Sequence, residues 1–197
     1  MESAFDQQEK AVEALNERGH HVRCIEDDSL SEANGHSASL NADRRTEGNG
    51  IGAEEARLLS QISDLVEIRV LPVGGPPKEF WDNLSRVETL LDFAAHYGLK
   101  DYGLQGLAKF PNLRTLTIWG RSTHLGALPD LPNLRLLHVE ETMMNAEDIR
   151  RIEEACPRLE EFVCDDIDED ALEILKSIER IKNVSAGVYE TGETTAQ

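Results

Sequence analysis

One ten-residue segment of this chain occurs twice, almost position for position. The segment FPNLRTLTIW at residues 110–119 returns 21 residues later as LPNLRLLHVE at residues 131–140. A period of this size is typical of proteins in which one short structural unit stacks on copies of itself. The sequence therefore predicts a stacked array, in a chain of 197 residues that is long enough to bury a sizeable core.

Both copies contain the pattern Leu-x-x-Leu-x-Leu, and this frame can be placed six times along the chain. The first positions lie 22, 26, 21, 25 and 22 residues apart, which is a nearly constant period. The inward positions of the six frames are Leu65, Ile68, Val70; Val87, Leu90, Asp92; Leu113, Leu116, Ile118; Leu134, Leu137, Val139; Leu159, Phe162, Cys164; and Ile181, Val184, Ala186. An unpaired carboxylate at the inward Asp92 would be costly, so the alternative that this frame slips by one residue stays open.

The intervals between the frames predict short return segments. NAEDIRRIEEACP predicts an amphipathic helix with Asn145 as its N-cap, and DEDALEILKSIER repeats this plan from Asp168. KEFWDNL and LQGLAKF predict one or two helical turns each, and HLGALPDL predicts a 3₁₀ turn. Prolines at positions 111, 132 and 157 then favour extended backbone where the next strand begins.

The segment GLKDYGLQGLAKFPNLRTLTIWG resembles bacterial leucine-rich repeats of the type I-T-D-x-G-L-x-x-L-x-x-x-P-x-L-x-x-L-x-L. The matching positions are Leu99, Asp101, Gly103, Leu104, Leu107, Pro111 and Leu113. GIGAEEARLLSQISDLVEIRVL and MMNAEDIRRIEEACPRLEEFVC follow the same plan more loosely. By analogy with helix-containing, ribonuclease-inhibitor-like arrays, the resemblance implies an α/β leucine-rich-repeat solenoid over residues 37–187, with a parallel concave sheet and short convex helices.

The two ends of the chain depart from the repeat. SAFDQQEKAVEALNERG predicts a helix and HHVRCIED a strand, so we expect residues 1–36 to form an N-terminal helix-strand cap. The polar, glycine-rich segment after this strand predicts a loop around one weak strand near residues 38–42. Residues 188–197 are polar and are expected to form a disordered tail.

The charge of the chain restricts its partners. A formal net charge of -18 disfavours binding to nucleic acid or to an anionic membrane and favours a cationic protein surface. The chain lacks an apolar run of membrane-spanning length, a signal-peptide pattern and a disulfide spacing among its three cysteines. We therefore expect a cytoplasmic protein with reduced thiols.

Catalytic and metal-binding patterns are weak. His20, His21 and Cys24 lie close in sequence, but a strand turns alternate side chains to opposite faces and no second ligand pair follows at zinc-site spacing. The acidic segment DDIDED lacks the glycine and the final glutamate of a calcium loop. The sequence predicts no catalysis, metal or cofactor. A metal-binding protein or enzyme that uses His20, His21 and Cys24, or a scaffold without a specific partner, stays as an alternative.

The outward strand positions predict a binding surface instead. In the frame Leu-x-x-Leu-x-Leu-x, the third, fifth and seventh positions face away from the core, because side chains alternate along a strand. The expected partner-binding residues are Leu91, Phe93, Thr115, Thr117, Trp119, Leu136, His138, Glu140, Glu161 and Asp165. Exposed aromatic side chains bordered by charge are typical of protein interfaces. We therefore expect a non-catalytic protein-protein interaction module, with an inhibitor or immunity-type protein as its sharper variant.

Overall fold

The computed structural model of the protein describes residues 3–25, 35–40, 51–71, 75–120 and 125–188. In these ranges, eight strands form one sheet in which each strand lies beside the next strand of the chain. β1 pairs with β2 in the antiparallel sense, and every later pair is parallel. The strands are β1 His21–Ile25, β2 Gly35–Leu40, β3 Leu65–Val70, β4 Asp92–Ala95, β5 Thr115–Trp119, β6 Leu136–Met144, β7 Glu161–Ile167 and β8 Asn183–Val188.

Short helices connect the parallel strands. The α-helices are α1 Ala4–Glu17, α2 Ala53–Leu59, α3 Lys78–Asn83, α4 Asp101–Gly106, α5 Ala146–Ala155 and α6 Glu169–Ser177, and the 3₁₀ turns are η1 Leu107–Lys109 and η2 Leu125–Ala127. Within the described residues, no helix is both long and apolar enough to cross a membrane. The predicted α/β class is confirmed as a mixed fold with a mostly parallel sheet.

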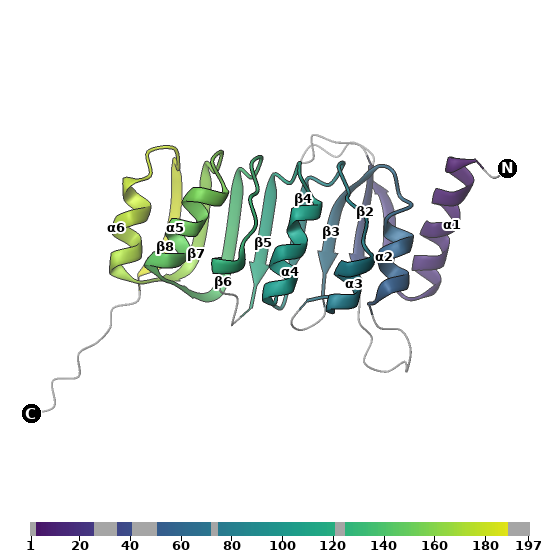
Figure 1. Ribbon diagram of the computed structural model, residues 1–197, viewed down its shortest axis with the longest axis horizontal. Helices are drawn as coiled ribbons and strands as arrows, with labels where there is room; N and C mark the ends of the chain where they lie inside the picture. Colours follow the sequence, from purple (N-terminus) through teal and green to yellow (C-terminus); the bar gives the residue numbers. More distant parts are fainter. Residues whose placement is uncertain (1–2, 26–34, 41–50, 72–74, 121–124, 189–197) are drawn as a thin grey trace, which may run out of the picture.

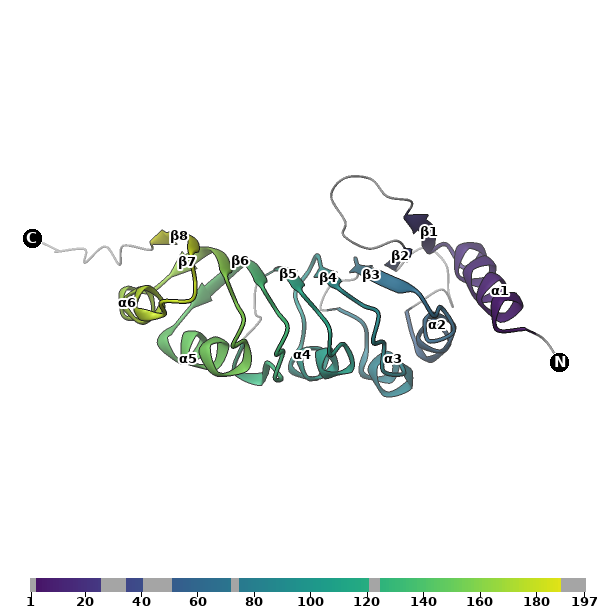
Figure 2. The same cartoon turned by 90° about the horizontal axis from the view of Figure 1, so that it is seen from above.

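The helices and the sheet form two layers. Figure 1 shows α2 to α6 side by side along one face of the sheet, and Figure 2 shows that the other face is left open. In the view of Figure 2 the row of strands is bowed, and the open face lies on the concave side. The core consequently lies between the strands and the row of helices, where the inward strand residues are buried.

The predicted return helices are found where their caps indicate. The Asn145 side chain accepts hydrogen bonds from the backbone N–H groups of Glu147 and Asp148, at 2.8 and 3.1 Å, and so begins α5. Asp168 begins α6 in the same way, with the Ala171 N–H as donor at 2.6 Å. The segment HLGALPDL contains the predicted 3₁₀ turn.

The core is built from the repeated inward positions. Leu113, Leu116 and Ile118 on the β5 side, and Leu137 and Val139 on β6, are essentially inaccessible to solvent. Adjacent parallel strands hold these residues in register, since Leu116 pairs with Leu137 and Ile118 with Val139. Every repeat therefore adds one rung to a continuous apolar column.

The frame around β4 differs from the sequence prediction. Phe93 pairs with Leu116 and is completely buried, where it stacks on Phe110 with ring centroids 5.6 Å apart. Asp92 pairs with Thr115 and lies on the open face. The inward set of this repeat is thus Leu90, Phe93 and Ala95, and the expectation that Phe93 is exposed is wrong. This frame buries a large aromatic ring beside Trp81 and Phe110 and avoids an inward carboxylate at Asp92.

The N-terminal helix and strand are found as α1 and β1. The expected boundary between the cap and the repeats, after residue 36, falls inside β2, and the weak strand expected at residues 38–42 is β2 at Gly35–Leu40. Of the expected tail, Val188 belongs to β8, and residues 189–197 lie outside the described residues, as do residues 41 and 42.

Candidate functional site

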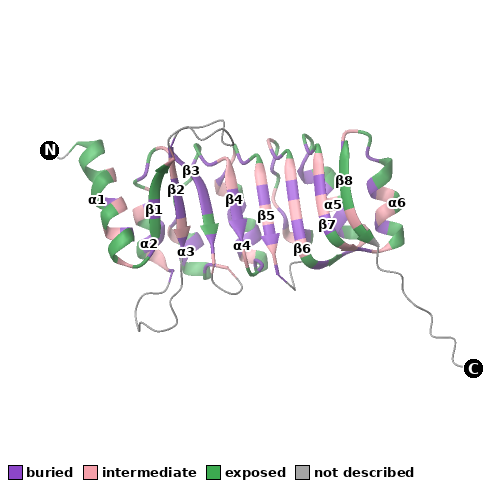
Figure 3. Ribbon diagram, turned by 180° about the vertical axis from the view of Figure 1, so that it is seen from behind, coloured by how far each residue is buried: buried purple, intermediate pink, exposed green. Residues whose placement is uncertain are grey.

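The open face carries rows of side chains that run across the strands. One row consists of residues whose positions pair from β2 to β8, namely Ser37, Glu67, Asp92, Thr115, Leu136, Glu161 and Asn183. A second row contains Ser39, Arg69, Ala94, Thr117, His138, Val163 and Ser185. Figure 3 shows the resulting alternation as bands of buried and half-buried residues along β5 and β6. These rows place side chains from distant parts of the sequence on one surface.

Trp119 is the last residue of β5 and lies on this face between two histidines. Its ring centroid is 4.2 Å from that of His96, which follows β4, and 6.1 Å from that of His138 on β6. The indole is half-buried, because these imidazoles cover part of it. Burial and the nearby Arg69 guanidinium both lower the pKa of His96, so this imidazole is neutral at pH 7. The three rings form an aromatic row with one accessible side.

Two carboxylates and one guanidinium lie beside this row. Glu67 on β3 pairs with Arg69 on the same strand, and Asp92 lies next to Glu67 in the sheet register. Burial and the negative charge of Glu67 raise the pKa of Asp92, Arg69 opposes both effects, and the resulting pKa is about 6. Because Arg69 already pairs with Glu67, the group Glu67, Arg69 and Asp92 keeps a net negative charge near neutral pH.

Other acidic residues predicted for the surface have structural partners. Glu140 lies 2.6 Å from the His138 imidazole, and the Glu161 carboxylate accepts a hydrogen bond from the Asn183 amide at 2.8 Å. The Asp165 carboxylate accepts from the backbone N–H of Glu141 at 2.8 Å, where β6 shifts register. Glu140 and Glu161 are half-buried on the open face, whereas Asp165 holds the irregular part of β6.

The structure brings most of the predicted residues together. Thr115, Thr117, Trp119, Leu136 and His138 lie on the open face with Glu140 and Glu161. Leu91 does not, because it precedes β4 and lies at the edge of the sheet where the strands begin, in the position that Arg114 takes one strand later. Phe93 is in the core, as described above.

We did not predict from the sequence that Glu67, Arg69, Asp92 and His96 lie together as one group. The error came from the second frame, which began at Val87 instead of Leu90. Leu90 lies 25 residues after Leu65 and 23 before Leu113, and these steps are more even than 22 and 26. The even spacing was the available signal, and it would have placed Asp92 outward.

The three residues of the metal-binding alternative do not converge. His20 is buried and lies 3.8 Å from the Glu55 carboxylate, beneath α2. His21 pairs with Ser39 on the open face, whereas Cys24 pairs with His36 on the helix side of the sheet. In the described ranges, no cluster of three or more metal-ligating side chains is found. Burial raises the pKa of Cys156 and of Cys164 to about 12, which keeps both thiols protonated at neutral pH.

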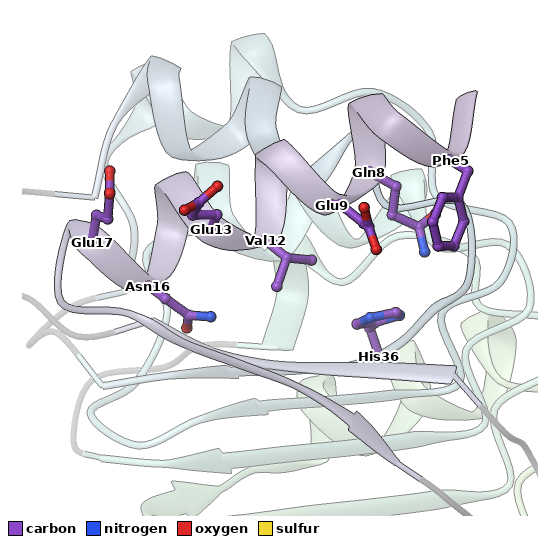
Figure 4. Close-up of a pocket in the computed structure, with 8 residues that line it drawn as sticks. All are labelled: Phe5, Gln8, Glu9, Val12, Glu13, Asn16, Glu17 and His36. Atoms are coloured by element: carbon purple, nitrogen blue, oxygen red, sulfur yellow. The ribbon is translucent and has the colours of Figure 1, made fainter. Parts of the chain in front are cut away.

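Two grooves open on other surfaces of the molecule. The larger, of about 890 Å³, lies between α1 and β2, and Figure 4 shows it extending from Phe5 at one end to Glu17 at the other, with His36 opposite Val12. A smaller groove of about 410 Å³ lies along the edge where β3 to β7 begin. Neither groove is lined by Trp119 or Asp92.

No protein-family model matches the chain, and no curated protein matches its sequence.

Proposed function

We propose that this chain is a leucine-rich-repeat solenoid that binds a protein partner with a cationic surface on the open face of its sheet. The sequential strand order and the row of helices on one side support the solenoid. The repeat period of 21 to 25 residues between Leu65, Leu90, Leu113, Leu134, Leu159 and Ile181 supports the leucine-rich-repeat assignment.

The observation that carries the binding proposal is the combination of one aromatic row with adjoining carboxylates on a single surface. Trp119 offers a large, pre-ordered apolar contact, because the neighbouring imidazoles restrict its ring. Asp92 adds a carboxylate that no described basic side chain pairs with directly, since Arg69 contacts Glu67. An arginine or lysine of a partner would restore charge balance at this position.

The net charge supports the choice of a basic partner. A charge of -18 attracts cationic proteins over several ångströms of solution and accelerates their association. In its more specific form, the proposal is an inhibitor or immunity-type role in which the open face covers a basic enzyme surface. Both the aromatic row and the net charge would contribute to such binding. Its association rate should fall steeply when salt is added.

The decisive experiment compares two aromatic variants in an affinity capture from native lysate. Trp119→Ala removes the indole ring from the open face, and Phe5→Ala removes an exposed ring on α1 as a matched control. We expect wild type and Phe5→Ala to retain the same basic protein, and Trp119→Ala to lose it. The binding loss should be on the order of 2 kcal/mol or more when measured with the purified partner.

Circular dichroism and thermal unfolding of each variant must accompany the capture. If Trp119→Ala keeps its fold and still retains the partner, the open face is not the binding surface. Capture of no specific protein by folded wild type, at low and at moderate salt, would favour the scaffold alternative. A retained partner that is acidic would contradict the electrostatic part of the proposal.

A further inference from the structure

The smaller groove gathers positive charge on a strongly acidic protein. Three arginines line it: Arg114 and Arg135 directly precede β5 and β6, and Arg158 lies in the turn before β7. The backbone N–H of Arg135 donates to the carbonyl of Arg114 at 2.8 Å, so these two residues occupy neighbouring rungs. Three arginines in a groove of about 410 Å³ are conspicuous in a chain with a net charge of -18.

The carboxylates near the groove have cationic partners outside it. Glu88 also lines the groove and pairs with Arg86 at 3.4 Å, and Glu160 pairs with Lys182 at 3.9 Å. Arg135 makes no ion pair with any residue that the structure describes. The positive charge of Arg135 is therefore available to a ligand.

The walls of the groove fix part of its cationic surface. The Arg158 guanidinium donates a hydrogen bond to the side-chain oxygen Oδ1 of Asn133 at 2.9 Å. The side-chain amide of Asn133 in turn donates to the backbone carbonyl of Pro111 at 3.0 Å. The Asn112 amide donates to the Glu88 carbonyl at 2.8 Å in the same manner. These bonds orient Arg158 through a side chain that is itself tied to the preceding repeat, which reduces the entropy lost on binding.

We propose that this groove binds a small ligand carrying two or more oxyanion groups. Planar guanidinium groups recognise phosphate and carboxylate oxygens with paired hydrogen bonds, and arginines on neighbouring strands about 4.8 Å apart suit adjoining anionic groups. Val66 and Leu91 line the same groove and accommodate an apolar part of the ligand. The volume lies in the range of small-molecule sites. This site is separate from the open face, and its existence does not depend on the proposed protein partner.

Isothermal titration calorimetry at low salt tests the site with inorganic pyrophosphate and with citrate. We expect saturable binding with one site per chain for at least one of these anions. Arg135→Gln and Arg158→Gln should each weaken that binding at least tenfold while their thermal unfolding stays close to that of wild type. Arg150→Gln, an equal charge change on the exposed side of α5, serves as the matched control and should bind like wild type.

The outcomes separate the ligand chemistries. Binding of pyrophosphate alone would assign the groove to phosphate compounds, and binding of both anions would assign it to oxyanions in general. Absence of saturable binding of either anion below about 10 mM, which corresponds to less than about 2.7 kcal/mol of binding free energy, would overturn the proposal. Equal weakening by Arg150→Gln would also overturn it, because only general charge would then be responsible. Trp119→Ala should leave anion binding unchanged.

Discussion

At the scale of single residues, position in the sheet decides chemical behaviour. Asp92 and Phe93 are neighbours in sequence, yet one lies on the open face with a raised pKa and the other is completely buried. The alternation of a strand explains this contrast, because it sends consecutive side chains to opposite faces. Substitutions at these two positions should therefore have opposite consequences for stability.

Asp92→Asn should stabilise the protein, and more so at higher pH. The pKa of Asp92 is about 6 in the folded state and 3.8 in a model peptide, so folding disfavours its charged form. The wild-type carboxyl carries no such cost below pH 3.8, and the cost develops as pH rises towards 6 and above. Urea unfolding at pH 4 and pH 8 should show the advantage of the variant growing by about 2 kcal/mol. An advantage that is equal at both pH values would contradict the assigned environment.

Phe93→Ala should destabilise the fold by about 3 to 5 kcal/mol, because it leaves a cavity beside Trp81 and Phe110. Thr115→Ala, on the open face of the next strand, serves as the control and should cost less than about 1 kcal/mol. Urea unfolding of both variants measures the difference. A small effect of Phe93→Ala would mean that the ring faces solvent, as the frame that begins at Val87 implied.

At the scale of single elements, the helices depend on their capping residues. α5 has ten residues and lies between the described ends of β6 and β7. A helix of this length is marginal in isolation, so its stability comes from the Asn145 cap and from burial of Ile149 and Ile152. Asp148 supports two elements at once, because its carboxylate accepts from the Asn145 N–H and from the Leu125 N–H of η2.

Asn145→Ala should lower the free energy of unfolding by about 1 kcal/mol. The substitution removes the acceptor of the Glu147 and Asp148 N–H groups at the beginning of α5. Glu153→Ala, at an exposed position of the same helix, should change stability by less than about 0.5 kcal/mol. Hydrogen exchange of the first α5 amides reports the local effect, and unchanged protection in Asn145→Ala would exclude a capping role.

At the scale of the whole molecule, repeat stacking and net charge act against each other. The stacked apolar column joins all repeats into one core, and this favours the folded state. Folding brings the charged groups that give the net charge of -18 closer together, so the repulsion between them opposes folding. The two tendencies respond differently to salt, because screening reduces only the repulsion.

Added sodium chloride should raise the melting temperature of the protein. If salt screens a long-range repulsion worth about 1 kcal/mol, the melting temperature of a chain of this size should rise by roughly 2 to 4 °C. Differential scanning calorimetry at 20 and 300 mM salt, with sucrose-free buffers of constant pH, measures this shift. A melting temperature that falls with salt would mean that attractive ion pairs dominate the electrostatics of the fold.

The repeat period and the caps made much of the fold predictable. The strands around Leu116, Leu137 and Phe162 and the helices after Asn145 and Asp168 follow from local patterns that need no distant contact. The exposed position of Trp119 in the alternation was predictable for the same reason, although the flanking His96 and His138 rings leave it only half-buried. The position of β4 was harder to predict, because Val87, Leu90 and Phe93 allow more than one apolar frame and only the even spacing of the repeats favours the frame that begins at Leu90.

The sequence by itself determined the α/β class, the order of the elements and the acidic character of the surface, since periodicity, capping and charge are local or additive properties. Only the tertiary structure decided that Phe93 is internal, that His96 and Asp92 join Trp119 on one face, and that three arginines share one groove. The physical reason is that these features depend on the register between strands about 20 residues apart in the chain. That register is set by aromatic packing around Trp81, Phe93 and Phe110, which no local pattern encodes.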